Sequence, residues 1–116
     1  MLTGMKHFED GSYETLTLKT GISGTIKAAK QNGLVHIMFQ NVAGYSTDTW
    51  AAVCDLDPKY QPKVNGTYGN FAVPASLGGG QYEFYSSNVY VGTDIEIKSH
   101  HAGNTTGSLI YFAKEP

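Results

Sequence analysis

The sequence has a single cysteine, Cys54, and therefore has no partner for a disulfide bond within the chain. Cys54 ends the apolar run Trp50–Cys54, a setting typical of a small buried hydrophobic side chain. A nucleophilic thiol needs a nearby base and a lowered pKa, and the sequence does not show that His36 or His100 lies beside it. We therefore expect a structural cysteine, in one core that is stable without disulfides or metal.

Clustered positive charge and long apolar runs are also missing. The eight basic residues are spread from Lys6 to Lys114 and the formal net charge is −2, whereas nucleic-acid phosphates are bound by clustered cations. No apolar run approaches the length of about 20 residues of a transmembrane helix. Met1 to Asp10 lacks the charged-then-apolar pattern of a secretion signal. We therefore expect synthesis in the cytoplasm, no nucleic-acid partner and no insertion into a membrane.

Helical periodicity is almost absent, and alternation with a period of two takes its place. Tyr13–Lys19 alternates along a first strand. Ile22, Gly24, Ile26 and Ala28 share one face of a second strand at 22–30, and Val35, Ile37 and Phe39 share one face of a third at 34–41. Asn32-Gly33 lies between these two strands, and both residues tolerate a positive φ, so the pattern predicts a tight hairpin.

Further short extended segments follow, interrupted by turn residues. Pro58 and Pro62 make 55–63 a rigid connection, since proline donates no amide hydrogen bond. Gly92-Thr93-Asp94 predicts a second hairpin turn, and 42–48 and 100–107 are expected to be loops. The remaining strands are expected at 50–54, 67–74, 81–86, 88–91, 95–99 and 108–113.

About eight or nine short strands at regular spacing predict an all-β fold, an antiparallel β-sandwich of jelly-roll type. The charged share of 16%, with 14 glycines in 116 residues, is consistent with many turns and few solvated helix faces. Residues 1–11 are the least patterned and are expected to be an N-terminal tether. Residues 12–116 are expected to form a single domain.

The segment Leu56-Asp57-Pro58-Lys59-Tyr60-Gln61-Pro62 resembles an element of phage and prophage proteins. Receptor-binding and baseplate proteins of phages of Gram-positive hosts often end in a domain with a Leu-Pro-x-Gly-Tyr-x-Pro-like element. In such domains a glycine-rich strand pair precedes the element, as Ile22 to Phe39 does here. A short hairpin and a last strand follow, as in Val89 to Ile97 and Leu109 to Phe112. Here the proline comes one place late and Lys59 replaces the glycine.

This resemblance implies a trimeric β-sandwich head on a tail fibre or baseplate of a virion, made in the host cytoplasm. Such heads recognise saccharides on the bacterial surface, and the other partners are further tail or baseplate proteins. The implied mechanism is adhesion without catalysis and without a cofactor, in which several weak sites on one virion act together.

Saccharide binding uses aromatic faces together with polar groups for the hydroxyls. Two groups of residues offer this mixture, although each aromatic residue, Trp50 above all, has packing in the core as its alternative. The candidate ligand-binding residues are Tyr45, Asp48, Trp50, Tyr82, Tyr85, His100, His101 and Asn104.

His36 shares a strand face with Met38 and Gln40, opposite Val35 and Ile37. A face of this composition is either a partly exposed strand or a subunit interface, where a three-fold axis brings three copies together. The three residues are therefore the candidate oligomer interface.

Catalytic and metal-binding chemistry has weaker signals. Asp94 and Glu96 share a strand face about 7 Å apart, within the range of glycosidase carboxylate pairs, but acidic residues on a solvated hairpin are much commoner. His100 and His101 are adjacent, so in an extended chain they point to opposite faces. We therefore assign no catalytic residue and no metal ligand. A purely structural tail module and a saccharide-cleaving tail enzyme remain the alternatives to a receptor-binding head.

Overall fold

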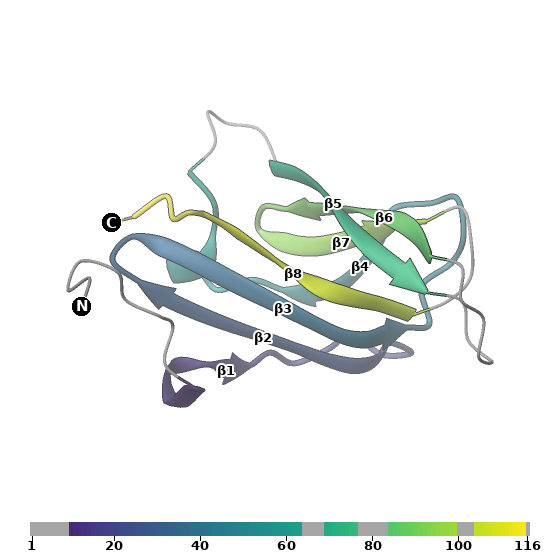
Figure 1. The fold of residues 1–116 in the computed structure, drawn as a ribbon, viewed down its shortest axis with the longest axis horizontal. Helices are drawn as coiled ribbons and strands as arrows, with labels where there is room; N and C mark the ends of the chain where they lie inside the picture. The colour runs from purple at the N-terminus through teal and green to yellow at the C-terminus, as the bar shows by residue number, and fades with distance from the viewer. Residues whose placement is uncertain (1–9, 64–68, 77–83, 100–103, 116) are drawn as a thin grey trace.

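The computed structural model describes residues 10–63, 69–76, 84–99 and 104–115 of the chain (Figure 1). Apart from two short 3₁₀ turns, η1 (Asp10–Ser12) and η2 (Pro58–Tyr60), the regular elements in this part of the chain are strands. They are β1 (Glu14–Thr15), β2 (Ser23–Gln31), β3 (Leu34–Ala43), β4 (Ala51–Asp55), β5 (Gly69–Ser76), β6 (Phe84–Val91), β7 (Asp94–Lys98) and β8 (Asn104–Phe112).

The strands form two layers that are joined at one corner. Hydrogen bonds connect them in the order β1-β2-β3-β8-β5-β6-β7-β4, and every pairing is antiparallel. The first layer contains β1, β2, β3 and β8, and the second contains β5, β6, β7 and β4 (Figure 1). In the described chain β8 pairs with β5 at Thr105 and Asn104, where the ladder passes from one layer to the other. The predicted all-β sandwich is confirmed.

A second connection holds the two outer edges of this ladder together. After β1 the chain crosses to β4, where Leu18 forms an antiparallel bridge with Cys54. The Lys19 amide donates a hydrogen bond to the Val53 carbonyl at 2.8 Å. Edge strands with free backbone groups invite pairing with other chains, so this bridge protects part of both edges.

Side-chain alternation builds the core between the layers. In β3, Val35 and Ile37 are fully buried and Phe39 is 2% exposed, as their predicted shared face requires. They pack in one cluster with inward side chains of the second layer, among them Val89, Val91, Ile95 and Ile97. Each such side chain contributes about 1.5–3 kcal/mol when fully buried, so these two faces supply much of the stability.

Cys54 belongs to this core, as the sequence predicts. Its side chain is fully buried, and burial raises the pKa of the thiol to about 12. A thiol with so high a pKa is protonated at neutral pH and is a poor nucleophile.

Both predicted hairpins are present. Asn32 and Gly33 connect β2 to β3 with φ values of 53° and 78°, the left-handed conformations that a two-residue turn of this type needs. Gly92 and Thr93 connect β6 to β7, and the Gly92 amide donates to the Asp94 carbonyl at 2.9 Å.

Several predicted strand limits are wrong. In the described chain, residues 84–86 of the expected strand 81–86 and the expected strand 88–91 lie on one strand, β6, whose pairing with β5 runs without a break from Phe84 to Val91. Likewise β8 begins at Asn104, so the second half of the expected 100–107 loop is strand. The reason is Thr105, which is fully buried and pairs with both β3 and β5.

Two more limits lie later in the chain than expected. β3 runs to Ala43 rather than ending at 41, because Asn41 at φ 52° forms a bulge that lets Val42 rejoin the ladder. β5 runs through Pro74 to Ser76. In the described chain β5 pairs with β8 only at Ala75 and Ser76, so Pro74 has a ladder partner on one side alone, a position that tolerates proline.

The segment Leu56–Pro62 joins the start of the domain to its last strand. Tyr60 is buried, and its hydroxyl donates to the Glu14 carboxylate in β1 at 2.8 Å. The Tyr111 hydroxyl of β8 donates to the Tyr60 carbonyl at 2.6 Å. The predicted rigid connection therefore also anchors β1 and β8. Residues 1–9 of the predicted tether lie outside the described residues, and the domain boundary at residue 12 stays a prediction.

We predict that alanine substitutions at Gly24 and Gly21 destabilise the domain, the first more than the second. Gly24 has φ +98°, and a Cβ there would lie 2.3 Å from the Asn41 carbonyl oxygen, so Gly24→Ala should cost most, about 3 kcal/mol. Gly21 has φ +88° with open space around it, so Gly21→Ala should cost about 1 kcal/mol.

Gly11→Ala is the matched control, because a Cβ at Gly11 meets nothing within 4 Å and no positive φ opposes it. Urea unfolding of the three variants measures the order. A Gly24→Ala protein as stable as the Gly11→Ala protein would contradict the close approach of Gly24 to the Asn41 carbonyl.

Candidate functional site

The predicted interface residues lie together on the outer face of the first layer. His36, Met38 and Gln40 alternate with buried residues along β3. His36 pairs with Ile110 of β8, and Leu34 pairs with Phe112 of the same strand. Among the described residues, the large hydrophobic side chains that remain exposed are all on this face, at 42% for Met38, 54% for Ile110 and 69% for Phe112. Exposed apolar side chains that gather on one face are typical of contact surfaces.

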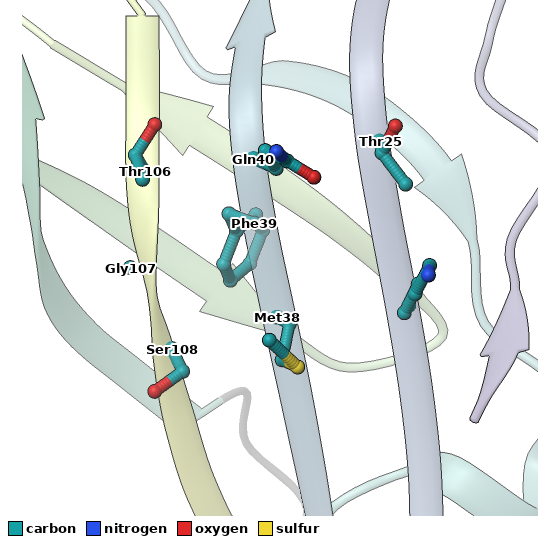
Figure 2. Close-up of a pocket in the computed structure, with 8 residues that line it drawn as sticks. Thr25, Met38, Phe39, Gln40, Thr106, Gly107 and Ser108 are labelled. Carbon is teal, nitrogen blue, oxygen red and sulfur yellow. The ribbon is translucent and has the colours of Figure 1, made fainter. Parts of the chain in front are cut away.

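A groove of about 480 Å³ runs across the same face. Figure 2 shows its lining side chains on three neighbouring strands. Gly107 of β8, which has no side chain, is the cross-strand partner of Phe39 of β3. The lining residues are Thr25, Lys27, Met38, Phe39, Gln40, Thr106, Gly107 and Ser108.

His36 is partly shielded at one end of this face. The Tyr13 hydroxyl is hydrogen-bonded to His36 Nδ1, and the two rings meet edge to face with centroids 5.6 Å apart. Burial lowers the pKa of His36, so the neutral imidazole is the favoured form. A neutral ring can accept the Tyr13 proton, whereas a protonated Nδ1 cannot.

The outer face of the second layer has a different chemistry. We use this name for Trp50, Asn88, Tyr90, Asp94, Glu96 and Lys98. The Trp50 and Tyr90 rings pack with centroids 4.3 Å apart and planes tilted by 46°. The Lys98 ammonium lies over the Trp50 ring, 5.9 Å from its centroid, within the range of a cation–π contact. Aromatic and polar side chains thus meet on one partly exposed surface.

A carboxyl pair continues this surface along β7. Glu96 is the cross-strand partner of both Tyr90 and Ala52. Burial and a hydrogen bond with Asp94 raise the pKa of Glu96. Asp94 Oδ1 is buried and has no hydrogen-bond partner, which is uncommon for a polar atom in a folded protein.

Two of the predicted ligand-binding residues lie at the Trp50 end of this face. Trp50 is partly exposed rather than fully in the core. Asp48 is exposed, has φ 61°, and its amide donates to the Ser99 carbonyl at 2.8 Å, just past the end of β7. The structure therefore brings Asp48 and Trp50 to the same edge of the β4–β7 pair.

Other predicted ligand residues are placed apart from them. Tyr45 is 7% exposed, and its hydroxyl is hydrogen-bonded to the Thr105 hydroxyl at 2.9 Å, so its burial argues against a direct ligand contact. Asn104 starts β8 and pairs with Ser76 at the corner between the layers. Tyr82, His100 and His101 lie outside the described residues, and so does the side chain of Tyr85.

Sequence reasoning missed Tyr90 and Lys98. The predicted turn at Gly92-Thr93-Asp94 held the signal, because the register of a short hairpin sets which residues face each other. In that register Tyr90 is opposite Glu96, and Asn88 is opposite Lys98. Within the described residues, no group of three His, Cys, Asp or Glu side chains could hold a metal ion.

Comparisons with known proteins support the fold. No family model matches the sequence, and no curated protein matches it. A solved structure that resembles the chain is the head domain of the lactococcal phage bIL170, a receptor binding domain. The TM-score is 0.67 at 11% sequence identity, over 92% of this chain and 99% of that chain. The resemblance to a phage head domain is thus confirmed for the fold.

We predict that His36 makes the stability of the domain depend on pH. Because its pKa is lowered in the folded protein, the unfolded chain binds the proton first, and stability falls as the pH drops below about 6.5. His36→Gln removes this titration and keeps an acceptor for the Tyr13 hydroxyl. Thermal unfolding at about pH 7.5 and pH 5 should therefore show a smaller loss for His36→Gln than for the unaltered protein.

The other three histidines are present in both proteins, so the difference between the two losses isolates His36. Equal losses would show that His36 is as easily protonated in the folded protein as in the unfolded chain.

Proposed function

We propose that this chain is the receptor-binding head of a phage tail protein and attaches the virion to a saccharide on the bacterial surface. The observation that carries the proposal is the likeness to the head domain of phage bIL170, which spans nearly the whole of both chains. The molecule then acts in the virion, at the tail tip or baseplate, after synthesis in the host cytoplasm. Its remaining contacts are with other tail proteins.

Saccharide as the ligand is supported by the outer face of the second layer. Sugar rings stack their apolar faces on aromatic side chains, and their hydroxyls bond to carboxylates and amides. Trp50 and Tyr90 supply the rings, and Asp48 and Asn88 are exposed beside them. Asn104 and the undescribed His100 and His101 stay as predicted contacts.

A homotrimer is supported by the outer face of the first layer. Met38 and Ile110 expose apolar surface beside His36 and Gln40, and association of three copies around an axis removes such surface from water. Three linked sites bind a repetitive cell surface more tightly than one, because each first contact raises the effective concentration for the next.

Binding without catalysis is the better-supported role for the Asp94–Glu96 carboxyl pair. Glycosidases hold their two carboxyl groups about 5–9.5 Å apart, with the scissile bond between them. The Asp94 and Glu96 carboxyl groups instead interact through a hydrogen bond that raises the pKa of Glu96, so they lie closer together than that range. No cofactor enters the proposal.

The trimer proposal predicts that a charge introduced into the interface lowers the mass of the protein in solution from that of a trimer to that of a monomer. The unaltered chain should have about three times its 12.5 kDa mass in solution. Ile110→Glu should yield monomers that keep their thermal stability, because Ile110 is 54% exposed and a charge is costly only in the interface. Light scattering coupled to size exclusion measures both masses.

Thr17→Glu is the matched control, since Thr17 is exposed and lies outside that face. It should leave the trimer intact. A chain that is monomeric before any substitution would overturn the proposed interface.

The receptor proposal predicts adsorption to cells that depends on Trp50 and Asp48. The labelled protein should bind lactococcal cells or other Gram-positive cells in a panel, and wall polysaccharide purified from the same cells should compete. Trp50→Ala and Asp48→Asn should each weaken adsorption about tenfold, the effect of losing a stacking or charged contact. Asp48→Asn preserves a side chain that tolerates positive φ.

Thr17→Ala serves as the control and should adsorb normally. Adsorption to no cell type, together with binding to other tail proteins, would favour the purely structural module. Release of new reducing ends from the polysaccharide would favour the saccharide-cleaving enzyme.

A further inference from the structure

The charges along β7 are arranged in a line on the outer face of the second layer. Asp94, Glu96 and Lys98 occupy alternate positions of the strand, so successive side chains lie about 7 Å apart on one face. The two carboxyl groups lie toward the β6–β7 turn, and the ammonium lies toward the Trp50 ring. The surface therefore has a negative end and a positive end.

Among the described side chains neither Asp94 nor Glu96 forms an ion pair, although the charge of Asp94 acts on Lys19 and helps to raise its pKa. The ion pairs in this part of the chain are Lys19 with Asp55 and Lys59 with Glu14. Asp55, the cross-strand neighbour of Asp94, is thus already neutralised. Asp94 Oδ1 is buried without a hydrogen bond, and a carboxylate shielded from water in this way is costly until a cation or donor reaches it.

The aromatic pair lies directly beside these carboxyl groups. Tyr90 is opposite Glu96 on β6 and packs against Trp50. Aromatic faces attract ammonium groups as well as sugar rings, and the contact of Lys98 with Trp50 is an instance within this chain. A sugar ring that bears an amine can stack on the aromatic pair and place its ammonium on the carboxyl groups at the same time.

We propose that the outer face of the second layer binds a saccharide with a free, protonated amine. The sugar ring packs on Trp50 and Tyr90, and its ammonium donates hydrogen bonds to Asp94 and Glu96. The inference rests on the proposed saccharide-binding function and names the chemical class of the ligand. An N-acetylated sugar has no charge to offer the carboxyl pair and binds more weakly.

The same geometry makes the affinity for an amine-bearing saccharide depend on pH. Because burial and Asp94 raise the pKa of Glu96, an arriving ammonium favours the ionised form and releases protons. The groups that face Glu96 are Asp94 and Lys98 from its own strand and Tyr90 from β6, while its β4 partner is the uncharged Ala52. Binding therefore weakens as the pH falls and Glu96 becomes protonated.

Titration calorimetry with two matched oligosaccharides tests the proposal. The full chain is titrated with a glucosamine oligomer and with its fully N-acetylated form of the same length. The glucosamine oligomer should bind about tenfold more tightly, as expected for charge-assisted hydrogen bonds. Repeating the titration at acidic pH, where Glu96 is partly protonated, in buffers of different ionisation enthalpy should show proton release.

Three substitutions distinguish this site from any other amine site. Glu96→Gln should abolish the preference for the amine and the proton release, whereas Glu115→Gln makes the same chemical change at an exposed position and should alter neither. Lys98→Met should strengthen amine binding, because it removes a like charge beside the site. Thermal unfolding of each variant verifies that it folds.

Equal affinity for the two oligomers, or a preference that survives Glu96→Gln, would overturn the amine assignment. Failure of both oligomers to bind, while wall polysaccharide still competes for cell adsorption, would overturn it and leave the receptor-binding function standing. If neither the oligomers nor wall polysaccharide bind, the saccharide function itself fails.

Discussion

Thr105 occupies the corner on which the two-layer arrangement depends. Its backbone pairs with Val42 in the first layer and Ala75 in the second. Its hydroxyl is fully buried, and a buried hydroxyl without partners costs about 1–3 kcal/mol. The Tyr45 hydroxyl at 2.9 Å and the Ser87 hydroxyl at 3.0 Å meet this need. The chain can therefore turn from one layer to the other inside the core, provided that all three hydroxyl groups remain there.

That corner also separates the two outer faces. Since inward and outward side chains alternate along every strand, the faces of β3 and β7 that lie outside the core point away from each other, one on each layer. The apolar row of Met38, Ile110 and Phe112 belongs to the first, and Trp50 belongs to the second. Association through the first face thus leaves the second in contact with solvent, so the proposed trimer and the proposed ligand site are compatible in one molecule.

The sequence pattern predicts the parts of the molecule whose structure depends on neighbouring residues alone. Asn32-Gly33 fixed one hairpin, and alternation placed His36 and Met38 on the outside of β3. Tyr45 was different, because its burial depends on Thr105, which lies 60 residues further along the chain. A run such as Asn104-Thr105-Thr106-Gly107 has the composition of a loop, and only contacts with β3 and β5 make it a strand. Composition near a turn therefore could not distinguish a recognition loop from the corner of the core.

Glu96, which is partly buried, differs from the fully packed titratable groups of the domain. Cys54 and Tyr111 also have raised pKa values because of burial, but both groups are ordinarily neutral at physiological pH, so their burial removes no charge from water. A carboxyl group is ordinarily ionised there, and the contact between Asp94 and Glu96 sets two such groups against each other. Their arrangement opposes folding unless a proton or a cation is shared between them. An ammonium ligand supplies that charge from outside, and this makes the carboxyl pair, rather than the buried thiol or phenol, the place where binding can change the chemistry of the domain.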